Sequence, residues 1–500
     1  MKQNRRDFLV RTGCTLSMTA LATQMRHFGL MSALAQKVDD ERRSIEPANI
    51  VPSDYRALVC VFLSGGNDGN NTVIPNHSDA TISNYTVYST ARNGAGLAIP
   101  QASLLPISVP RMGGLTYGLH PGLGTQPAGT NIVNNGIHEL WGLGKMAIVA
   151  NVGTLVAPTS RTTYLNNSVP KPFQLFSHSD QVSQYQGGRS DTESFTGWGG
   201  RISDLRTFPD NPGGLIPMIT SIAGAQLFTA GQSTLPLAIG TGNLANVLNP
   251  SSPNTNGSAV RNAFNGLRTV DLTNDLIVAA NHVTDSAIAG NNALQTTVDV
   301  TTTFPGTSIG TQLRQVARLI KNRAALQVNR QVFFVQLGGF DTHNGQVTQQ
   351  NTLLIQLSQA MRSFYDEMVA QTIADKVTQF TMADFSRTFN PAGTGAGVVG
   401  TDHAWGNHHF VVGGGVTGSD FYGMNGSNGT PYPHLGFNTG DDSDNGSTAR
   451  GRWVPATSVE QYAATLARWY GLPDTNLGTV FPKIGNFTTS NLGFMQPPAA

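Results

Sequence analysis

Acidic and histidine side chains gather in the stretch from residue 331 to residue 415. Two apolar runs in this stretch, 331–337 and 377–382, are each followed at once by residues of these types. The side chains concerned are Asp341, His343, Asp384, Asp402, His403, His408 and His409. Carboxylate oxygens and imidazole nitrogens are ligands that divalent metals take in proteins. The stretch therefore predicts half of a metal or anion site, and the other half must come from earlier in the chain.

The spacing within these groups indicates which side chains can share a ligand. Asp341 and His343 are two residues apart, so in extended backbone both point to the same side. Asp402 and His403 are adjacent and diverge, so we expect only one of them to be a direct ligand. In the alternative interpretation, the carboxylates cap loops and the histidines pack on the surface. If metals do bind, they could hold ester oxygens during displacement at phosphorus or sulfur.

The other half of the site is predicted at the end of the earliest buried strand. Residues 56–63 are continuously apolar, which is typical of a strand buried on both faces of a parallel sheet. Gly65 and Gly66 then let the backbone turn sharply, and Asp68 lies just beyond the carboxyl end of the strand. In open α/β sheets, that edge is where ligands bind.

Helical and strand-like patterns alternate along the rest of the chain. Thr457 and Glu460 form a predicted capping box. This order predicts an α/β fold with a doubly wound, mostly parallel sheet and helices on both faces, and with a β-rich insertion at about 205–305. Further strands are predicted at 145–152, 331–337, 377–382 and 410–413, and helices at 131–143, 259–292, 309–326, 352–371 and 458–470.

Composition and the N-terminal sequence limit the functions that this chain can have. Charged residues make up 12% of the chain and the net charge is +1, so there is no electrostatic case for binding nucleic acid. The hexapeptide 4–9, NRRDFL, resembles the twin-arginine export motif, and Ala33-Leu34-Ala35 is a plausible cleavage site. We therefore expect export through the twin-arginine translocase to the periplasm or beyond, with a signal peptide at 1–35, a linker at 36–54 and one domain at 55–500.

Two further features of the sequence concern membrane insertion and the cysteines. Arg26 and His27 interrupt the apolar part of the signal, so no stable membrane span is expected in the mature form. The two cysteines are Cys14, which leaves with the signal, and Cys60, which lies in the first apolar run. The mature chain is therefore expected to lack an internal disulfide and a cysteine-based zinc site.

Three other motifs have simpler interpretations. The sequence 395–400, GAGVVG, matches a dinucleotide-binding pattern but does not lie between a strand and a helix. Ser308 lies in GTSIG, a nucleophile-elbow pattern; a helix N-cap is the simpler interpretation and a serine hydrolase the alternative. Residues 440–446, GDDSDNG, resemble part of a calcium loop, but Arg452 occupies the position of the bidentate glutamate, so a solvated acidic turn is favoured.

An ordered set of motifs resembles a known exported bacterial family, catalogued as domain of unknown function 1501. The motifs are LVCVFLSGGNDGNNTVIP, SHSDQ, TGWGGR, LGGFDTH, DFSRT and GTDHAWGNHHFVVGGG, from about residue 55 to the C-terminal LGF. That family resembles the alkaline phosphatase and sulfatase superfamily. The resemblance implies an alkaline-phosphatase-like sheet with metal ligands at its carboxyl edge.

The resemblance also implies roles for particular residues. The implied metal ligands are Asp68, Asp341, His343, Asp384 and His403, with Ser177 as nucleophile and Arg387 holding an anionic substrate. Phe385 stands where the phosphatase pattern has histidine, which favours one divalent metal (zinc, calcium or magnesium) over two. The expected function is hydrolysis of phosphate or sulfate esters. The alternative is a catalytically decayed protein that binds a periplasmic partner.

Overall fold

The computed structural model describes residues 54–127, 135–241, 299–395, 397–438, 440–445 and 450–497, with isolated positions between 262 and 294. The predicted export signal, its cleavage site and most of the predicted helix at 259–292 lie outside these residues. Within the described ranges, no helix is long and apolar enough to cross a membrane.

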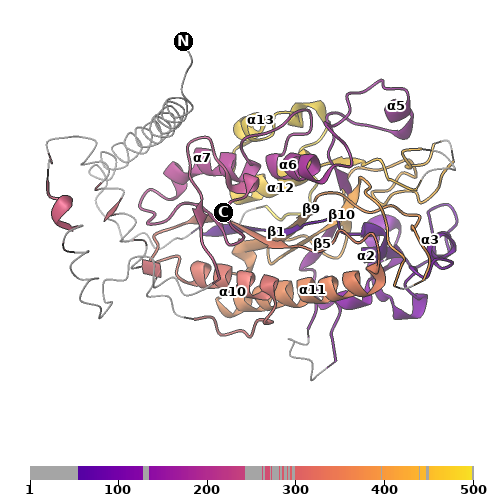
Figure 1. Cartoon of the computed structure of the whole chain (residues 1–500), viewed down its shortest axis with the longest axis horizontal. Coiled ribbons are helices and arrows are strands. Elements are labelled where there is room, and N and C mark those ends of the chain that lie inside the picture. Colours follow the sequence, from indigo (N-terminus) through magenta and orange to yellow (C-terminus); the bar gives the residue numbers. More distant parts are fainter. Residues whose placement is uncertain are drawn as a thin grey trace, which may run out of the picture.

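Nine strands of the described chain form one sheet, in the order β11-β5-β10-β9-β1-β8-β6-β7, with β12 also paired to β5 (Figure 1). Among these strands only β10 runs antiparallel to its neighbours. The prediction of a mostly parallel sheet is therefore confirmed. The strands are β1 (Arg56–Leu63), β5 (Met146–Gly153), β6 (Ile219–Ser221), β7 (Leu237–Ala238), β8 (Arg330–Leu337), β9 (Val377–Ala383), β10 (Asn407–Gly413), β11 (Phe421–Tyr422) and β12 (Thr457–Ser458).

The central strands are buried on both faces. In β1, alternate side chains enter two separate hydrophobic clusters: Val59 and Val61 pack on one face, and Cys60 and Phe62 on the other. This follows from the two-residue side-chain period of a strand, and explains why β1 is apolar throughout. The edge strands β6 and β7 extend this sheet within the predicted β-rich insertion.

Helices cover both faces of the sheet (Figure 1). On one face lie α10 (Ser308–Lys321) and α11 (Gln346–Ala370), and on the other lie α6 (His178–Gly187), α7 (Trp198–Asp210), α12 (Val459–Tyr470) and α13 (Leu477–Val480). The predicted caps are wrong by one residue. Thr307, not Ser308, caps α10, and the capping box of α12 joins Ser458 to Gln461.

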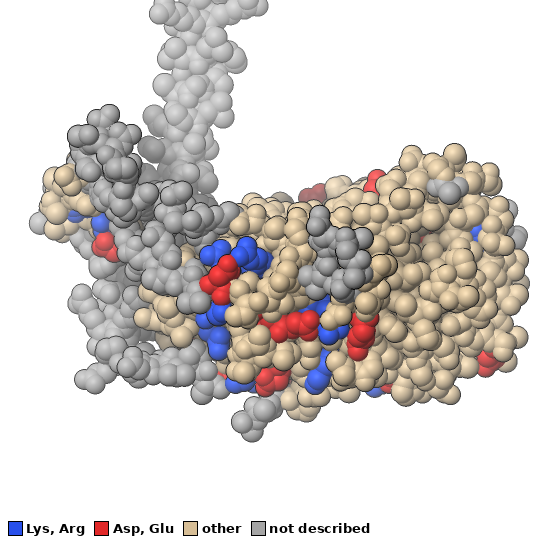
Figure 2. All heavy atoms as spheres, turned by 90° about the horizontal axis from the view of Figure 1, so that it is seen from below, with Lys and Arg blue, Asp and Glu red and all other residues tan. Residues whose placement is uncertain are grey.

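Smaller elements surround one end of the sheet. They are α2 (Gly69–Thr72), α3 (Tyr85–Arg92), α4 (His138–Gly142), α5 (Arg161–Leu165) and a three-stranded antiparallel sheet of β2 (Val73–Pro75), β3 (Leu105–Val109) and β4 (Leu115–Leu119). Figure 2 shows the face that α10 and α11 cover: acidic and basic side chains lie next to one another and uncharged residues dominate. This face therefore offers no large patch of a single charge.

Glu460, at the start of α12, is a buried carboxyl group. Burial raises its pKa to about 8, and the nearby Arg201 only partly offsets this effect. One oxygen accepts a hydrogen bond from the backbone N–H of Lys483 at 2.9 Å, whereas Oε1 has no partner among the described residues. Glu460 is therefore protonated in the folded chain at neutral pH.

We predict that Glu460→Gln stabilises the protein in alkaline but not in acidic solution. An unfolded glutamate ionises near pH 4.5 and the folded one near 8, so folding binds a proton between these values and stability falls as pH rises through that window. The neutral amide avoids this loss, which is roughly 4–5 kcal/mol above pH 8. Denaturant unfolding at pH 5 and pH 8.5 measures the difference.

Glu367→Gln is the matched control, because hydrogen bonds from Thr301, Thr302 and Gln371 outweigh the effect of burial and lower the pKa of Glu367. That substitution should destabilise the protein at pH 8.5. An equal response of the two variants to pH would contradict the assignment of Glu460.

Candidate metal centre

One edge of the sheet brings together loops from distant parts of the chain. Asp341 and His343 follow β8, and Asp384 and Arg387 follow β9. Because β10 is antiparallel to β9, the segment that enters β10 lies at this same edge, and it carries His403. His178 is the first residue of α6. The parallel sheet with one reversed strand therefore positions all these side chains.

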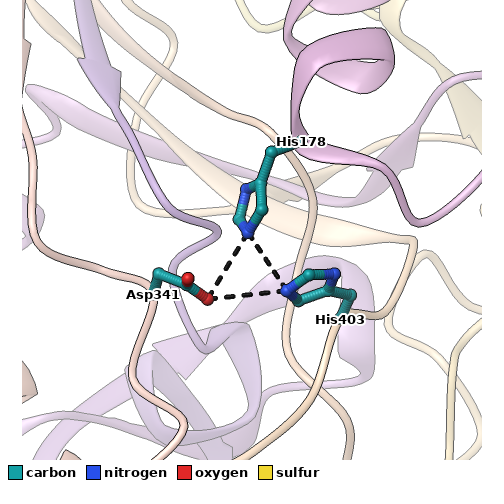
Figure 3. A group of neighbouring side chains, drawn as sticks. All are labelled: His178, Asp341 and His403. Carbon is teal, nitrogen blue, oxygen red and sulfur yellow. Dashed lines mark hydrogen bonds and ion pairs between the residues drawn. The ribbon is translucent and has the colours of Figure 1, made fainter.

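Two groups of three ligand-bearing residues lie at this edge and share His403: His178, Asp341 and His403 form one group, and His343, Asp402 and His403 form the other. Nε2 of His403 lies 3.1 Å from Nε2 of His178 and 3.1 Å from Nε2 of His343. Oδ1 of Asp341 lies 3.0 Å from the His343 nitrogen, 3.4 Å from that of His178 and 3.5 Å from that of His403. Figure 3 shows His178, Asp341 and His403 pointing at a common centre.

The separations within the group of His178, Asp341 and His403, from 3.1 to 3.5 Å, are close to those between ligands of one metal. Bonds of 2.0–2.1 Å in tetrahedral geometry place two ligand atoms roughly 3.3–3.4 Å apart. The centre is open to solvent on one side, since the side chains of His178, His403 and Asp341 are 32%, 23% and 46% exposed. These three atoms could therefore hold a cation of the size of zinc and leave a ligand position open.

The outer nitrogens of two histidines fix the tautomers of their rings. Nδ1 of His178 lies 2.6 Å from Oδ2 of Asp384, and Nδ1 of His403 lies 2.9 Å from the backbone oxygen of Phe176. An ionised carboxylate and a carbonyl only accept hydrogen bonds, so both Nδ1 atoms carry the proton. In the neutral rings, both Nε2 atoms then present lone pairs to each other, and either a bound cation or a proton on one of them relieves this contact.

The pKa values of these histidines differ in direction. The hydrogen bond to Asp384 raises the pKa of His178 above 6.5, although partial burial acts against it. Burial lowers the pKa of His403. His403 therefore loses its proton at lower pH than His178. In the metal-free protein, a proton on His178 can satisfy the contact with His403, and His343 can donate to Oδ1 of Asp341 at 3.0 Å.

Buried Arg387 orients Asp341. Its Nη1 donates to Oδ1 of Asp341 at 2.7 Å and to the backbone oxygen of Gly65 at 3.1 Å, and its other nitrogens donate to Thr401. Partial burial raises the pKa of Asp341, but the hydrogen bond and charge of Arg387 outweigh this and hold it below 3.8. The Arg387 side chain is 0% exposed, so it does not face an incoming substrate.

Two backbone features bring the loops close enough for these contacts. Gly65 has φ of +113°, and a side chain there would lie 2.4 Å from the backbone nitrogen of Asp341. Phe176 has φ of +69°, an uncommon value for a residue with a side chain, and its carbonyl is the one that His403 binds. Strained backbone of this kind is often found at functional sites.

The structure brings together only part of the predicted ligand set. Asp341, His343 and His403 converge, whereas Asp384 lies behind His178 and contacts its outer nitrogen. Asp68 lies outside the group. Its carboxylate pairs with buried Arg92 at 2.6 Å and accepts hydrogen bonds from two nitrogens of Arg92, from the backbone N–H of Asn70 and from the side chain of Gln346. These four donors occupy its four lone-pair positions.

His178 was missed by sequence reasoning, although the neighbouring Ser177 was considered as a nucleophile. The Ser177 hydroxyl hydrogen-bonds to Asp180 and Ser179 of its own helix. The signal that could have identified His178 is its place in SHSDQ, at the start of a helix that follows a buried strand. No pattern in the sequence indicates its contact with Asp384, because 206 positions separate them.

The remaining residues of the predicted cluster have other surroundings. His408 and His409 are buried in β10, where His408 stacks on Tyr432 and His409 on Tyr462. Asp402 lies 4.0 Å from Nδ1 of His343 and pairs with Arg450 at 3.1 Å. In the segment 440–446, Asp442 accepts hydrogen bonds from backbone N–H groups and is buried, so the prediction of a solvated acidic turn is wrong there.

Comparisons with known proteins concern the family resemblance and the fold. The model of a family described as "Protein of unknown function (DUF1501)" matches residues 255–434, which confirms the resemblance over that segment. No curated protein matches the chain. Among solved structures, the chain is similar to the PsFucS1 sulfatase from Pseudoalteromonas sp., at 8% identity with a TM-score of 0.26 over 80% of this chain and 68% of that chain. A similarity this low carries no argument about activity.

Asp384→Asn should weaken zinc binding by roughly 10- to 100-fold, the usual cost of losing a group that orients a metal ligand. Gly65 N–H donates to Oδ1 of Asp384 at 3.1 Å and His178 donates to Oδ2, so both neighbours require an acceptor. An amide offers only one oxygen and must present its NH₂ group to the other neighbour. Competition with a chromophoric chelator measures the affinity.

The matched control is Asp474→Asn, which removes a surface carboxylate that is 73% exposed and pairs with Arg468. It should bind zinc like the parent protein. Unchanged zinc affinity in Asp384→Asn would mean that Asp384 does not orient a metal ligand.

Proposed function

We propose that this chain is a hydrolase of phosphate or sulfate esters that uses one divalent metal, held by His178, Asp341 and His403. The observation that carries the proposal is the convergence of three ligand atoms: Nε2 of His178 and of His403, 3.1 Å apart, and Oδ1 of Asp341. Two imidazoles and one carboxylate suit zinc or a similar transition metal, because calcium and magnesium prefer all-oxygen sites. Of the metals considered from the sequence, zinc is thus favoured.

The protein's own residues supply orientation and charge balance in this proposal. Asp384 and the Phe176 carbonyl hold two imidazoles in the tautomer that binds metal, and Arg387 holds Asp341 ionised. When bound, the metal would supply Lewis acidity toward an ester oxygen and lower the pKa of a bound water. The proposed nucleophile is this water, since the Ser177 hydroxyl is committed to Asp180.

One observation favours a second function. A fourth protein ligand would fill a tetrahedral zinc site, and filled sites are typical of structural metals; the candidate is His343, whose Nε2 lies 3.1 Å from that of His403. If all four bind at once, the metal stabilises the fold and the protein acts by binding a partner, as in the alternative expected from the sequence. Turnover decides between the two, because only a catalytic site leaves or opens a position for substrate.

We predict that protein purified without chelator contains about one equivalent of zinc and that His403→Ala loses it, together with turnover of p-nitrophenyl phosphate or sulfate. His403 contributes to both short nitrogen–nitrogen contacts, so no other residue can replace it. Elemental analysis and a chromogenic assay measure the two effects. The control is His434→Ala, because His434 also bonds a carboxylate, Asp441 at 2.7 Å, outside the site.

Two outcomes would change the proposal. Stoichiometric zinc without turnover of either ester would favour the structural role. A loss of turnover by more than about 100-fold in Ser177→Ala, with zinc retained, would assign the nucleophile to Ser177, because removing a group that acts through the reacting atoms has effects of that size.

Zinc affinity should fall as pH decreases, beginning above pH 6.5. The raised pKa of His178 means that a proton competes for its Nε2 at higher pH than in a free imidazole, whereas His403 stays neutral to lower pH. Binding is therefore strongest above the pKa of His178. Titration with zinc at pH 5.5, 6.5 and 8 measures the trend, and pH-independent affinity would contradict His178 as a ligand.

A further inference from the structure

The arginines of the site differ in how completely their charges are neutralised. Arg387 pairs with Asp341 at 2.7 Å and is fully buried. Arg450 pairs with Asp402 at 3.1 Å. Arg452, by contrast, has Asp444 as its nearest carboxylate, at 3.8 Å, and burial raises the pKa of Asp444, which disfavours its ionised form. Arg452 is therefore the least neutralised cation at this edge.

Arg452 is fixed against the two backbone segments that supply His403 and His178. Its Nε donates to the backbone oxygen of His403 at 3.1 Å. Its guanidinium carbon lies 4.0 Å from the ring centroid of Phe176. The carbonyl of Phe176 is hydrogen-bonded to His403, and Phe176 lies two residues before His178. These two contacts hold the guanidinium in one orientation beside the metal ligands.

The outer nitrogens of Arg452 remain available. Within the described part of the chain, neither Nη1 nor Nη2 makes a hydrogen bond, and the side chain is 31% exposed. A guanidinium offers two parallel N–H groups that match two oxygens of a phosphate or sulfate. Pre-orientation by the Phe176 ring reduces the conformational entropy lost when an anion binds.

The charges around the centre also favour an anion. The carboxylates of Asp341 and Asp402 are matched by Arg387 and Arg450, whereas the hydrogen bond from His178 leaves the charge of Asp384 in place. A divalent cation together with Arg452 would exceed that remaining charge, so the site as a whole would be positive. A neutral ester would not be attracted by this net charge, whereas an anionic group would be attracted by both the cation and Arg452.

From this arrangement we propose that Arg452 is the specificity-determining residue of the site, which recognises the tetrahedral oxyanion of a phosphate or sulfate monoester. The inference rests on the proposed function, and it assigns to Arg452 the anion contact that the sequence assigned to Arg387. Arg387 then serves to position Asp341. Neutral esters lack the charge, and phosphate diesters have two unsubstituted oxygens where a monoester has three, so both are poor substrates for such a site.

Isothermal titration of the zinc-loaded protein with inorganic phosphate and with inorganic sulfate tests the proposal. We expect Arg452→Met to weaken binding of the preferred anion by roughly 10- to 100-fold, the usual size of a lost hydrogen bond to a charged group. Arg452→Lys keeps the charge without the paired N–H groups. Its affinity for the anion should lie between those of the parent protein and Arg452→Met. Zinc content measured in parallel shows that the metal ligands are intact.

The matched control is Arg111→Met. Like Arg452, Arg111 is a partly exposed arginine that stacks on an aromatic ring, Tyr422 at 4.3 Å. It pairs with the carboxylate of Asp420 and lies outside the site. It should bind the anions like the parent protein. Equal affinity of Arg452→Met and the parent, or an equal loss in Arg111→Met, would overturn the proposal.

Anion binding and ester turnover, measured separately, distinguish the role of Arg452 from the proposed hydrolase function. Anion binding that depends on Arg452, without ester turnover, would retain the recognition site and remove the hydrolase. Turnover of a monoester that is unchanged in Arg452→Met, in KM as well as kcat, would retain the hydrolase and overturn Arg452 as its specificity residue. A comparison of phosphate with sulfate identifies which oxyanion the site prefers.

Discussion

The buried guanidinium of Arg387 joins the three loops on which the site depends. It donates to the backbone of Gly65 after β1, to the carboxylate of Asp341 after β8 and to Thr401 in the loop that carries His403. A buried charge of this kind is costly unless it is paired and hydrogen-bonded. Because Arg387 meets that condition only when all three loops are in place, it couples the positions of the proposed metal ligands to one another.

A second layer of buried polar groups extends this coupling. The side chain of Gln346 accepts from Thr401 and donates to Asp68, and Asp68 pairs with Arg92. Asp68 is thus connected to the site through hydrogen bonds. A carboxylate at the carboxyl end of a buried strand can bind a metal or hold neighbouring loops together. In this chain its lone pairs are used for the second purpose.

The sequence carries enough information to predict the sheet and half of the site. The apolar run of β1 and its repetition in β8 and, less completely, in β9 indicate a parallel sheet, and the position of Asp341 and His343 after β8 places them at its carboxyl edge. The role of Asp68 depends on Arg92, and that of Asp384 depends on His178, 206 positions away. Such pairings are set by how loops from separate strands meet in space, and residue type and local spacing do not encode them.

The reversed strand β10 has a consequence for how the molecule is assembled. It alone joins β5, with β11 and β12 beside it, to β9 and the parallel strands beyond. Within the described sheet, the two halves therefore share no strand pairing until β10 is in place. His178 comes from the connection that follows β5, while Asp341 and Asp384 follow strands of the other half. The ligand cluster therefore draws on both halves of the sheet, and β10 is the strand whose pairing joins those halves.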